Sequence, residues 1–237
     1  MELHRVESTN NYAMGMVRAA MAHHGMAVFA REQTKGKGQR EKEWISEPGS
    51  NIALSMVIEP EIAETARAFL LSMSAALAVL DLVSEYITDG LSIKWPNDLY
   101  WNDRKAAGIL IENLWQGTEW KFAVVGVGIN VNQTEFGPLT GKAVSIKQVT
   151  GRSNDTLQMA RRLCEKMDKR LALLQSDAGA IISAYNSHLY RLHSVARFRK
   201  GNRVFDARVS HVEAGGQLVL HHGVEERFAV GEIEWVI

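Results

Sequence analysis

The sequence predicts an α/β chain that ends in a small β-barrel, and two patterns support this prediction. Up to about residue 190, stretches with helical spacing alternate with apolar strand-like runs, which is typical of α/β proteins. From Ser194 onward, apolar and polar residues alternate, turn signals recur and no stretch has helical spacing. We therefore expect two domains, 1–190 and 191–237.

The first elements follow from capping and periodicity. Ser8 and Thr9 precede apolar residues at helical spacing, so a helix should begin there, and Gly25 should close it. Three further elements are expected in chain order: strands at 26–30 and 51–58, separated by a polar loop at 33–43, and a long helix at about 61–86.

Strands dominate the middle of the chain, and helices follow them. Five elements complete the first domain: strands at 92–95, 105–114 and 120–132, and helices at about 154–175 and 178–190. The last two strands should join through a turn around Gln116 and Gly117. In the second domain, turn signals at 200–202, 215–216 and 222–223 divide the chain into four or five short antiparallel strands, which favours a barrel.

Composition and charge argue against several classes of protein. Lys plus Arg equals Asp plus Glu, 27 each, so a general affinity for DNA or for a membrane surface is not expected, and any cationic site must be local. The longest uncharged apolar-rich run, 68–80, is shorter than the roughly 20 residues that span a bilayer. The N-terminus lacks a signal-peptide pattern, and the single cysteine, Cys164, cannot form an intramolecular disulfide. We expect a cytoplasmic protein.

The loop at 33–44, QTKGKGQREKEW, combines cations with glycines. Glycines let a backbone fold closely around a ligand, and cations suit a site where a carboxylate must approach a phosphate. The spacing is not that of a P-loop. The alternative is an exposed flexible loop with solvated charges.

Two short motifs lie at strands. In KWPND at 94–98, Pro96 ends regular pairing, so the Lys94 amine should be free to reach an anion. The alternative is a strand that ends in an ordinary turn formed by Asn97 and Asp98.

The second motif, GVGIN at 126–130, lies inside a strand-like run, where glycines mark a close approach to the backbone. Asn130 could then present its amide to an adenine or a ribose. The motif lacks the third glycine and following helix of a dinucleotide fingerprint. The alternative is tight packing against a neighbouring strand.

Taken in order, these stretches resemble a known family. STN at 8–10, the glycine loop, KWPND followed by Lys105 and GIL at 108–110, and GVGIN are together similar to the catalytic domain of the biotin protein ligases. The segment from Ser194 is similar to their C-terminal barrel. The resemblance implies a mixed β-sheet flanked by helices, of the class II synthetase-like type, followed by a small Src-homology-3-like β-barrel.

The resemblance also implies a reaction with ATP, biotin and Mg²⁺. Biotin would be activated to biotinyl-5′-AMP with release of pyrophosphate, and then transferred to a lysine of a biotin carboxyl carrier protein or carrier domain of a carboxylase, with release of AMP. The resemblance allows a homodimer. Because the chain begins almost at the STN motif, we expect an enzyme without an N-terminal DNA-binding domain.

Site residues are carried over by position. The residues expected to bind biotin are Ser8, Thr9, Asn10, Gln33, Gly36, Lys37, Gly38, Gln39, Lys94, Gly108 and Ile109. Those expected to bind ATP or the adenylate are Lys37, Arg40, Trp44, Lys94, Lys105 and Asn130. Catalysis is assigned to Lys94, Arg40 and Lys37, and the magnesium ligands are left open.

Two positions depart from the family pattern, and two alternatives stay open. Gln39 stands where an arginine is common and Glu41 where a glycine is common, so we expect retained activity with a less tightly held intermediate. A lipoate ligase is the related alternative, although KWPND with GxGxN favours biotin. The other is a module that binds biotinyl-adenylate without transferring it.

Overall fold

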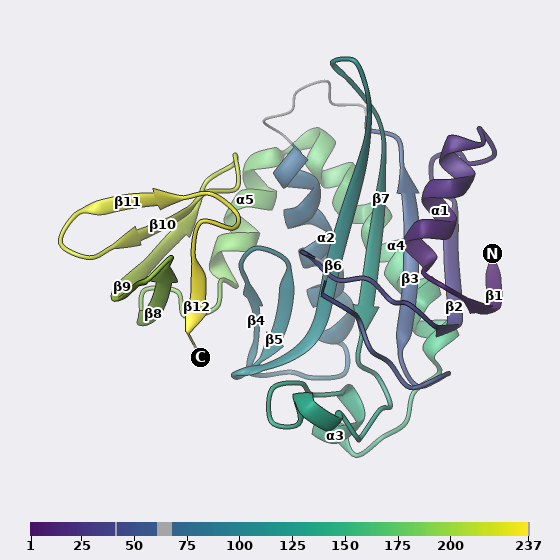
Figure 1. Cartoon of the computed structure of the whole chain (residues 1–237), viewed down its shortest axis with the longest axis horizontal. Helices are drawn as coiled ribbons and strands as arrows, with labels where there is room; N and C mark the ends of the chain where they lie inside the picture. Colours follow the sequence, from purple (N-terminus) through teal and green to yellow (C-terminus); the bar gives the residue numbers. More distant parts are fainter. Residues whose placement is uncertain (41, 61–67, 237) are drawn as a thin grey trace.

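The main body of the molecule is a seven-stranded mixed sheet (Figure 1). The computed structural model describes every residue except 41, 61–67 and 237. The strands are β1 (Glu2–Val6), β2 (Ala27–Gln33), β3 (Ile52–Ile58), β4 (Leu91–Lys94), β5 (Asp98–Trp101), β6 (Arg104–Gln116) and β7 (Glu119–Ile129). Their order is β1-β2-β3-β7-β6-β5-β4, and β1 pairs with β2 in parallel while the other pairs are antiparallel.

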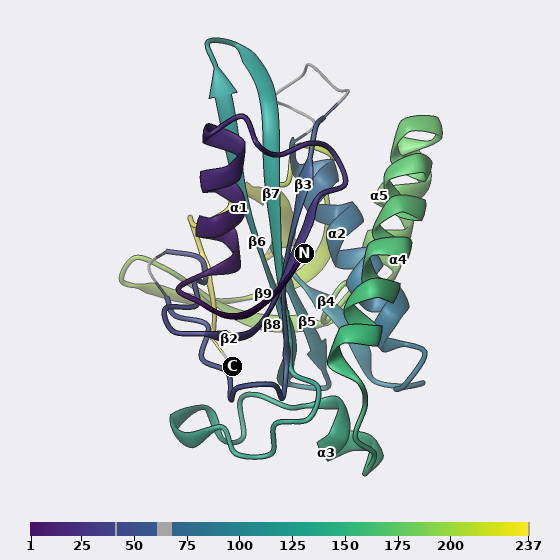
Figure 2. The ribbon, with the colours of Figure 1, turned by 90° about the vertical axis from the view of Figure 1, so that its right-hand side faces the viewer.

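Helices cover both faces of this sheet, as the edge-on view shows (Figure 2). One face carries α1 (Thr9–Arg18); the other carries α2 (Ala68–Val83) and α4 (Thr156–Ser176), with α5 (Ala178–Ser187) beside α2. The short helices η2 (Gly137–Leu139) and α3 (Ile146–Thr150) follow β7. Among the described residues, no helix combines the length and the apolar character needed to cross a membrane.

The central strands β3 and β7 are mainly apolar on both faces, since both faces of the sheet are covered there. Val57 and Val124 pack under α1 with Met14, whereas Met56 and Val125, one residue along, belong to the core under α2 and α4. This follows from the alternation of side chains along a strand.

A second sheet of five antiparallel strands forms the C-terminal part. Its strands are β8 (Val195–Lys200), β9 (Arg203–Val212), β10 (Leu218–His221), β11 (Glu225–Phe228) and β12 (Glu234–Val236), in the order β11-β10-β9-β8-β12. Figure 1 shows it beside α5, β4 and β5. Phe198 and Phe228 lie in the same buried cluster as the main sheet, and the Trp95 indole nitrogen donates to the Gly216 carbonyl at 2.9 Å. The two sheets are therefore packed as one body.

The structure confirms the predicted α/β class with a C-terminal antiparallel sheet. It corrects the end of the first helix, which stops at Arg18 because the backbone turns left-handed at Ala20 (φ 54°), well before Gly25. Likewise, α5 ends at Ser187 rather than near 190. The predicted start of the long helix, 61–67, lies outside the described residues. The division at residue 190 remains a prediction; the second sheet begins at Val195.

Two strands were not predicted. β1 is a half-exposed edge strand whose charged residues obscure its alternation, and β5 is only four residues long and directly follows the turn at Asn97. Short or edge strands carry too few buried side chains to leave a clear pattern.

Candidate functional site

A row of small residues leaves a trough on the face of the sheet that carries α1. Ala53, Gly128 and Gly108 are register partners on β3, β7 and β6, and Gly126 lies two residues along β7 from Gly128. Further along this face, Val57 and Val124 fill the space under α1. The trough therefore opens where α1 begins, beside Thr9 and Asn10.

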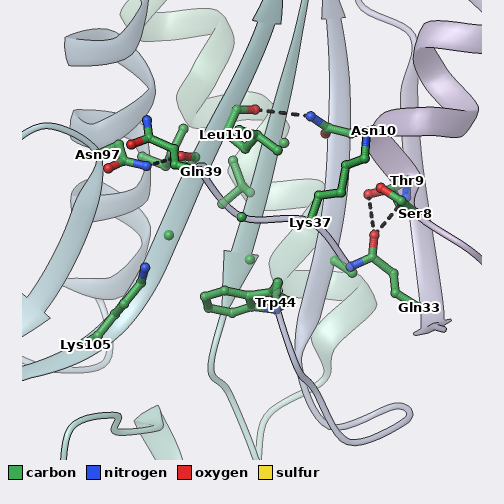
Figure 3. A pocket seen from close by; sticks show the side chains of 17 residues that line it. Ser8, Thr9, Asn10, Gln33, Lys37, Gln39, Trp44, Asn97, Lys105 and Leu110 are labelled. Carbon is green, nitrogen blue, oxygen red and sulfur yellow. Dashed lines mark hydrogen bonds between the residues drawn. The ribbon is translucent and has the colours of Figure 1, made fainter. Parts of the chain in front are cut away.

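Figure 3 shows the cavity that forms over this trough. It is lined by Ser8, Thr9, Asn10, Gln33, Lys37, Gly38, Gln39, Trp44, Ala53, Asn97, Lys105, Gly108, Ile109, Leu110, Gly126, Val127 and Gly128. We call it the first cavity. Its residues come from the start of α1, the end of β2 and the loop after it, the β4–β5 turn, and strands β3, β6 and β7, so segments far apart in sequence meet there.

One end of the first cavity is a buried polar network. Gln33 Oε1 accepts hydrogen bonds from the Thr9 backbone N–H at 2.8 Å and from Thr9 Oγ1 at 3.0 Å. The Ser55 hydroxyl lies 2.8 Å from Thr9 Oγ1 and 2.6 Å from Asn10 Oδ1. The Asn10 amide donates to Glu112 Oε2 at 2.9 Å. Such a network fixes donors and acceptors in place for a polar ligand.

The glycines of GVGIN permit two close approaches, as predicted. A Cβ on Gly126 would lie 2.1 Å from Asn10 Oδ1, and a Cβ on Gly128 would lie 2.4 Å from Trp44 Cε2. The missing side chains thus make room for the α1 N-terminus and for an indole from the glycine loop.

The glycine loop folds back on itself over the cavity. The Trp44 N–H donates to the Gly36 carbonyl at 2.9 Å, and the Gly38 N–H donates to the Lys42 carbonyl at 2.6 Å. Arg40, at the tip, has a left-handed backbone (φ 53°). Lys37 points toward the polar end, where its Nζ lies 3.7 Å from Glu112 Oε1 (Figure 3). The departure noted at Glu41 falls outside the described residues.

A second cavity, of about 430 Å³, lies between this loop, the β4–β5 turn and the C-terminal sheet. It is lined by Gly38, Gln39, Arg40, Lys42, Glu43, Trp44, Ile45, Lys94, Trp95, Pro96, Asn97, Asp98, Lys105, Asn130, Phe136, Leu139, Ala143, Val230, Gly231, Ile233, Glu234 and Trp235. The cavities share five of these residues: Gly38, Gln39, Trp44, Asn97 and Lys105. The two cavities therefore adjoin each other along these five residues.

Lys94 lies at the end of β4 and faces the second cavity. Its amine donates a hydrogen bond to the Tyr100 hydroxyl at 3.3 Å. The same amine lies 4.8 Å from the centre of the Tyr100 ring and 5.8 Å from the centre of the Trp235 ring. Burial lowers the pKa of Lys94 to about 8; the Asp98 carboxylate opposes this, and Lys105 and Lys42 reinforce it. An anionic ligand would favour the charged form of this amine.

Two polar residues shape the region between the cavities. The Asn97 amide donates to the Ile109 carbonyl at 2.5 Å, and the Asn130 amide donates to the Lys105 carbonyl at 3.2 Å. Lys105 Nζ pairs with Asp98 at 2.7 Å and lies 5.7 Å from the Trp44 ring centre. A cation therefore sits at the junction.

The structure gathers almost all predicted site residues. Those that line the first cavity are Ser8, Thr9, Asn10, Gln33, Lys37, Gly38, Gln39, Gly108 and Ile109, together with Trp44 and Lys105. Lys94, Arg40 and Asn130 line only the second cavity, so Lys94 is not in the first. Gly36 lines neither, and instead packs against the Trp44 carbonyl.

The sequence analysis missed several residues. Ser55 interrupts an otherwise apolar buried strand, a signal that could have been used. Asn97 and Asp98 were named only as turn formers in the alternative interpretation of KWPND, and neither they nor Glu112 were among the predicted site residues. Trp235 carried no signal in the sequence, because only the packing of the C-terminal sheet brings it close to Lys94.

Comparisons with known proteins identify the family of the chain. The family model described as the biotin/lipoate A/B protein ligase family matches residues 2–130. The biotin–[acetyl-CoA-carboxylase] ligase of Paracoccus denitrificans is 31% identical over 226 residues, 92% of each chain. The bifunctional ligase/repressor BirA of Bacillus subtilis is 28% identical over 200 residues, 83% of this chain and 61% of that relative, so the chain spans less than two thirds of it.

Solved structures share the fold. The biotin protein ligase of Aquifex aeolicus in complex with biotin and ATP aligns with a TM-score of 0.85 at 22% identity, over 100% of this chain and 97% of that one. The Leishmania major enzyme in complex with biotinyl-5-AMP aligns with a TM-score of 0.64 at 22% identity, over 96% and 97%. With the family model covering more than half of the sequence, the chain belongs to the biotin/lipoate A/B protein ligase family.

Proposed function

We propose that this chain is a biotin protein ligase. In the first step, a biotin carboxylate oxygen attacks the α-phosphorus of ATP, the bond to pyrophosphate breaks, and biotinyl-5′-AMP forms. In the second step, a lysine amine of a carrier protein attacks the acyl carbon, AMP leaves with the C–O bonding electrons, and the amine loses a proton. The observation that carries the proposal is the pair of cavities with a shared wall, polar at one end and cationic at the junction.

The polar end of the first cavity supports biotin as the acid. The ureido ring of biotin carries two N–H donors and one carbonyl, which match the amides and hydroxyls of Thr9, Asn10, Gln33 and Ser55. The dithiolane ring of lipoate has no N–H donor and no carbonyl, so it could not exchange hydrogen bonds with these groups. The site therefore favours biotin over lipoate.

Four cations from three segments, the glycine loop, β4 and β6, support a site where two anions meet. Lys37 lies in the first cavity, Lys105 at the junction, and Lys94 and Arg40 in the second. We assign Lys94 to the charge that develops on the carboxyl and phosphate oxygens, with Lys37 and Arg40 in support. Trp44 and Asn130 would face the adenine.

Magnesium would arrive as part of the nucleotide substrate. Within the described part of the chain, no group of three or more His, Cys, Asp or Glu side chains could form a metal cage. Mg²⁺ at nucleotide sites needs only one or two carboxylates besides phosphates and water, and Asp98 in the second cavity fits that role. When bound, the ion would offset phosphate charge.

The partners follow from the same proposal. The acceptor would be a biotin carboxyl carrier protein or a carrier domain of a biotin-dependent carboxylase. A homodimer, a cytoplasmic location and the absence of operator binding remain predictions that belong to this proposal.

The test is isotope exchange between ATP and pyrophosphate with biotin or lipoate as the acid. Exchange that requires biotin is expected, and exchange that requires lipoate would replace the proposal with a lipoate ligase. Labelled biotin should then appear on a purified carrier domain. Adenylate formation without transfer would reduce the chain to an adenylate-binding module.

A further inference from the structure

Trp235 brings a side chain of the C-terminal sheet close to Lys94, a cation that lines the second cavity. Its indole nitrogen donates to the Trp95 carbonyl at 3.1 Å, and its ring centre lies 4.6 Å from Phe198 and 5.5 Å from Tyr190. Contacts from both sheets therefore fix the ring. A ring held in this way can set the position of a neighbouring flexible side chain.

Lys94 is such a flexible side chain. Lys94 is the last residue of β4, and four methylene groups separate its amine from the backbone. The amine lies 4.8 Å from the Tyr100 ring centre and 5.8 Å from the Trp235 ring centre. Aromatic faces attract an ammonium within about 6 Å, so these two rings restrict where the amine rests. Among the described residues, no carboxylate lies within ion-pair distance of it.

We infer that Trp235 is a positioning residue for Lys94, and that with Tyr100 it holds the amine in the second cavity, where the anionic reactants would bind. This inference rests on the proposed function. It makes the C-terminal sheet a contributor to the chemistry of the main domain, through one indole.

The charges that face Lys94 come from several elements. Asp98 on β5 favours its charged form, and Lys105 on β6 and Lys42 in the glycine loop disfavour it, but burial dominates. Trp235 supplies part of that burial, so a smaller side chain should admit water and raise the pKa of Lys94 from about 8 toward its ordinary value.

The experiment compares three variants of the full chain in biotin-dependent exchange. Trp235→Leu should lower kcat about tenfold with little change in the KM for biotin, whereas Trp235→Phe, which keeps a ring, should stay within about threefold. Phe205→Leu is the matched control, because Phe205 packs against Phe198 and Phe228 in the same sheet. It should leave kcat within about twofold.

A second measurement does not depend on activity. The pH dependence of Lys94 labelling by an amine reagent, followed by mass spectrometry, should move upward in Trp235→Leu and stay unchanged in Phe205→Leu. If the two variants lose kcat equally, or if the labelling profile does not move, the positioning role is wrong while the proposed function stands. If wild-type chain shows no biotin-dependent exchange, the proposed function fails, and the labelling profile alone decides the contact between Trp235 and Lys94.

Discussion

The cations of the site are held by different kinds of partner. Lys105 lies against Asp98 at 2.7 Å, and Lys37 is 3.7 Å from Glu112. Lys94 has a hydroxyl and two aromatic rings instead. An amine without a carboxylate partner does not have to break an ion pair before it stabilises a ligand, which suits Lys94 to the developing charge.

Replacing Lys94 with alanine should lower the rate of adenylation by two to three orders of magnitude, since a donor of this kind contributes roughly 2.7–4 kcal/mol. Pre-steady-state formation of biotinyl-5′-AMP measures the effect. Lys121→Ala, on the exposed β6–β7 hairpin, is the control. A loss under about tenfold would remove Lys94 from its assigned role.

The same amine predicts a pH dependence. Because the pKa of Lys94 is lowered to about 8, the amine loses its proton, and its positive charge, as pH rises through that value. The kcat/KM of adenylation, which reports the free enzyme, should therefore fall above about pH 8. A profile that is flat from pH 7 to 10 would contradict the assignment.

Gly128→Ala tests the shared wall. The new methyl would lie 2.4 Å from Trp44 Cε2, so the indole must move, and Trp44 lines both cavities. Calorimetric titration should show weaker binding of both biotin and ATP. Gly15→Ala is the control, because its methyl meets open space on helix α1 and alanine favours a helix.

At the scale of elements, the N-termini of α4 and α1 have different roles. Asp155 caps α4 through bonds from the Leu157 and Gln158 N–H groups at 2.9 and 3.0 Å, and it lines neither cavity. Ser8 caps α1 through one longer bond of 3.4 Å to the Asn11 N–H, and it also lines the first cavity. The cap at Asp155 should therefore contribute mainly to stability, and the cap at Ser8 mainly to ligand binding.

Asp155→Ala should lower the free energy of unfolding by about 0.5–2 kcal/mol and leave exchange activity unchanged. Ser8→Ala should cost less stability but weaken biotin binding. Denaturant unfolding and biotin titration of both variants measure this. Equal effects on biotin affinity would mean that the α1 N-terminus has only a structural role.

Elements with strong patterns could be predicted from the sequence, and those defined by tertiary contacts could not. The spacing of GVGIN indicated a close approach to β7, and the structure supplies Asn10 and Trp44 as the approaching groups. The polar network around Ser55 and the contact of Trp235 with Lys94 join residues more than 40 positions apart. The periodicity of a segment shows which of its side chains are buried, but not which distant segment packs against them.

At the scale of the whole molecule, the two sheets share one buried core, and the second cavity lies between them. We expect a single unfolding transition with coincident far- and near-UV signals. Biotin and ATP together should raise the midpoint temperature of this transition, since a ligand at 100 times its Kd adds about 2.7 kcal/mol to the free energy of unfolding. Two separated transitions, with only the first moved by ligand, would contradict this view.

The glycine-lined trough limits how the substrate range of this protein can be changed. Three of its four floor positions, Gly108, Gly126 and Gly128, have no side chain left to remove, and at Ala53 only a methyl remains. Substitution on the sheet can make the floor shallower but hardly deeper. To accept a bulkier acid, the protein must therefore be given smaller side chains on the opposite side of the cavity, at Gln39 and Trp44 of the glycine loop.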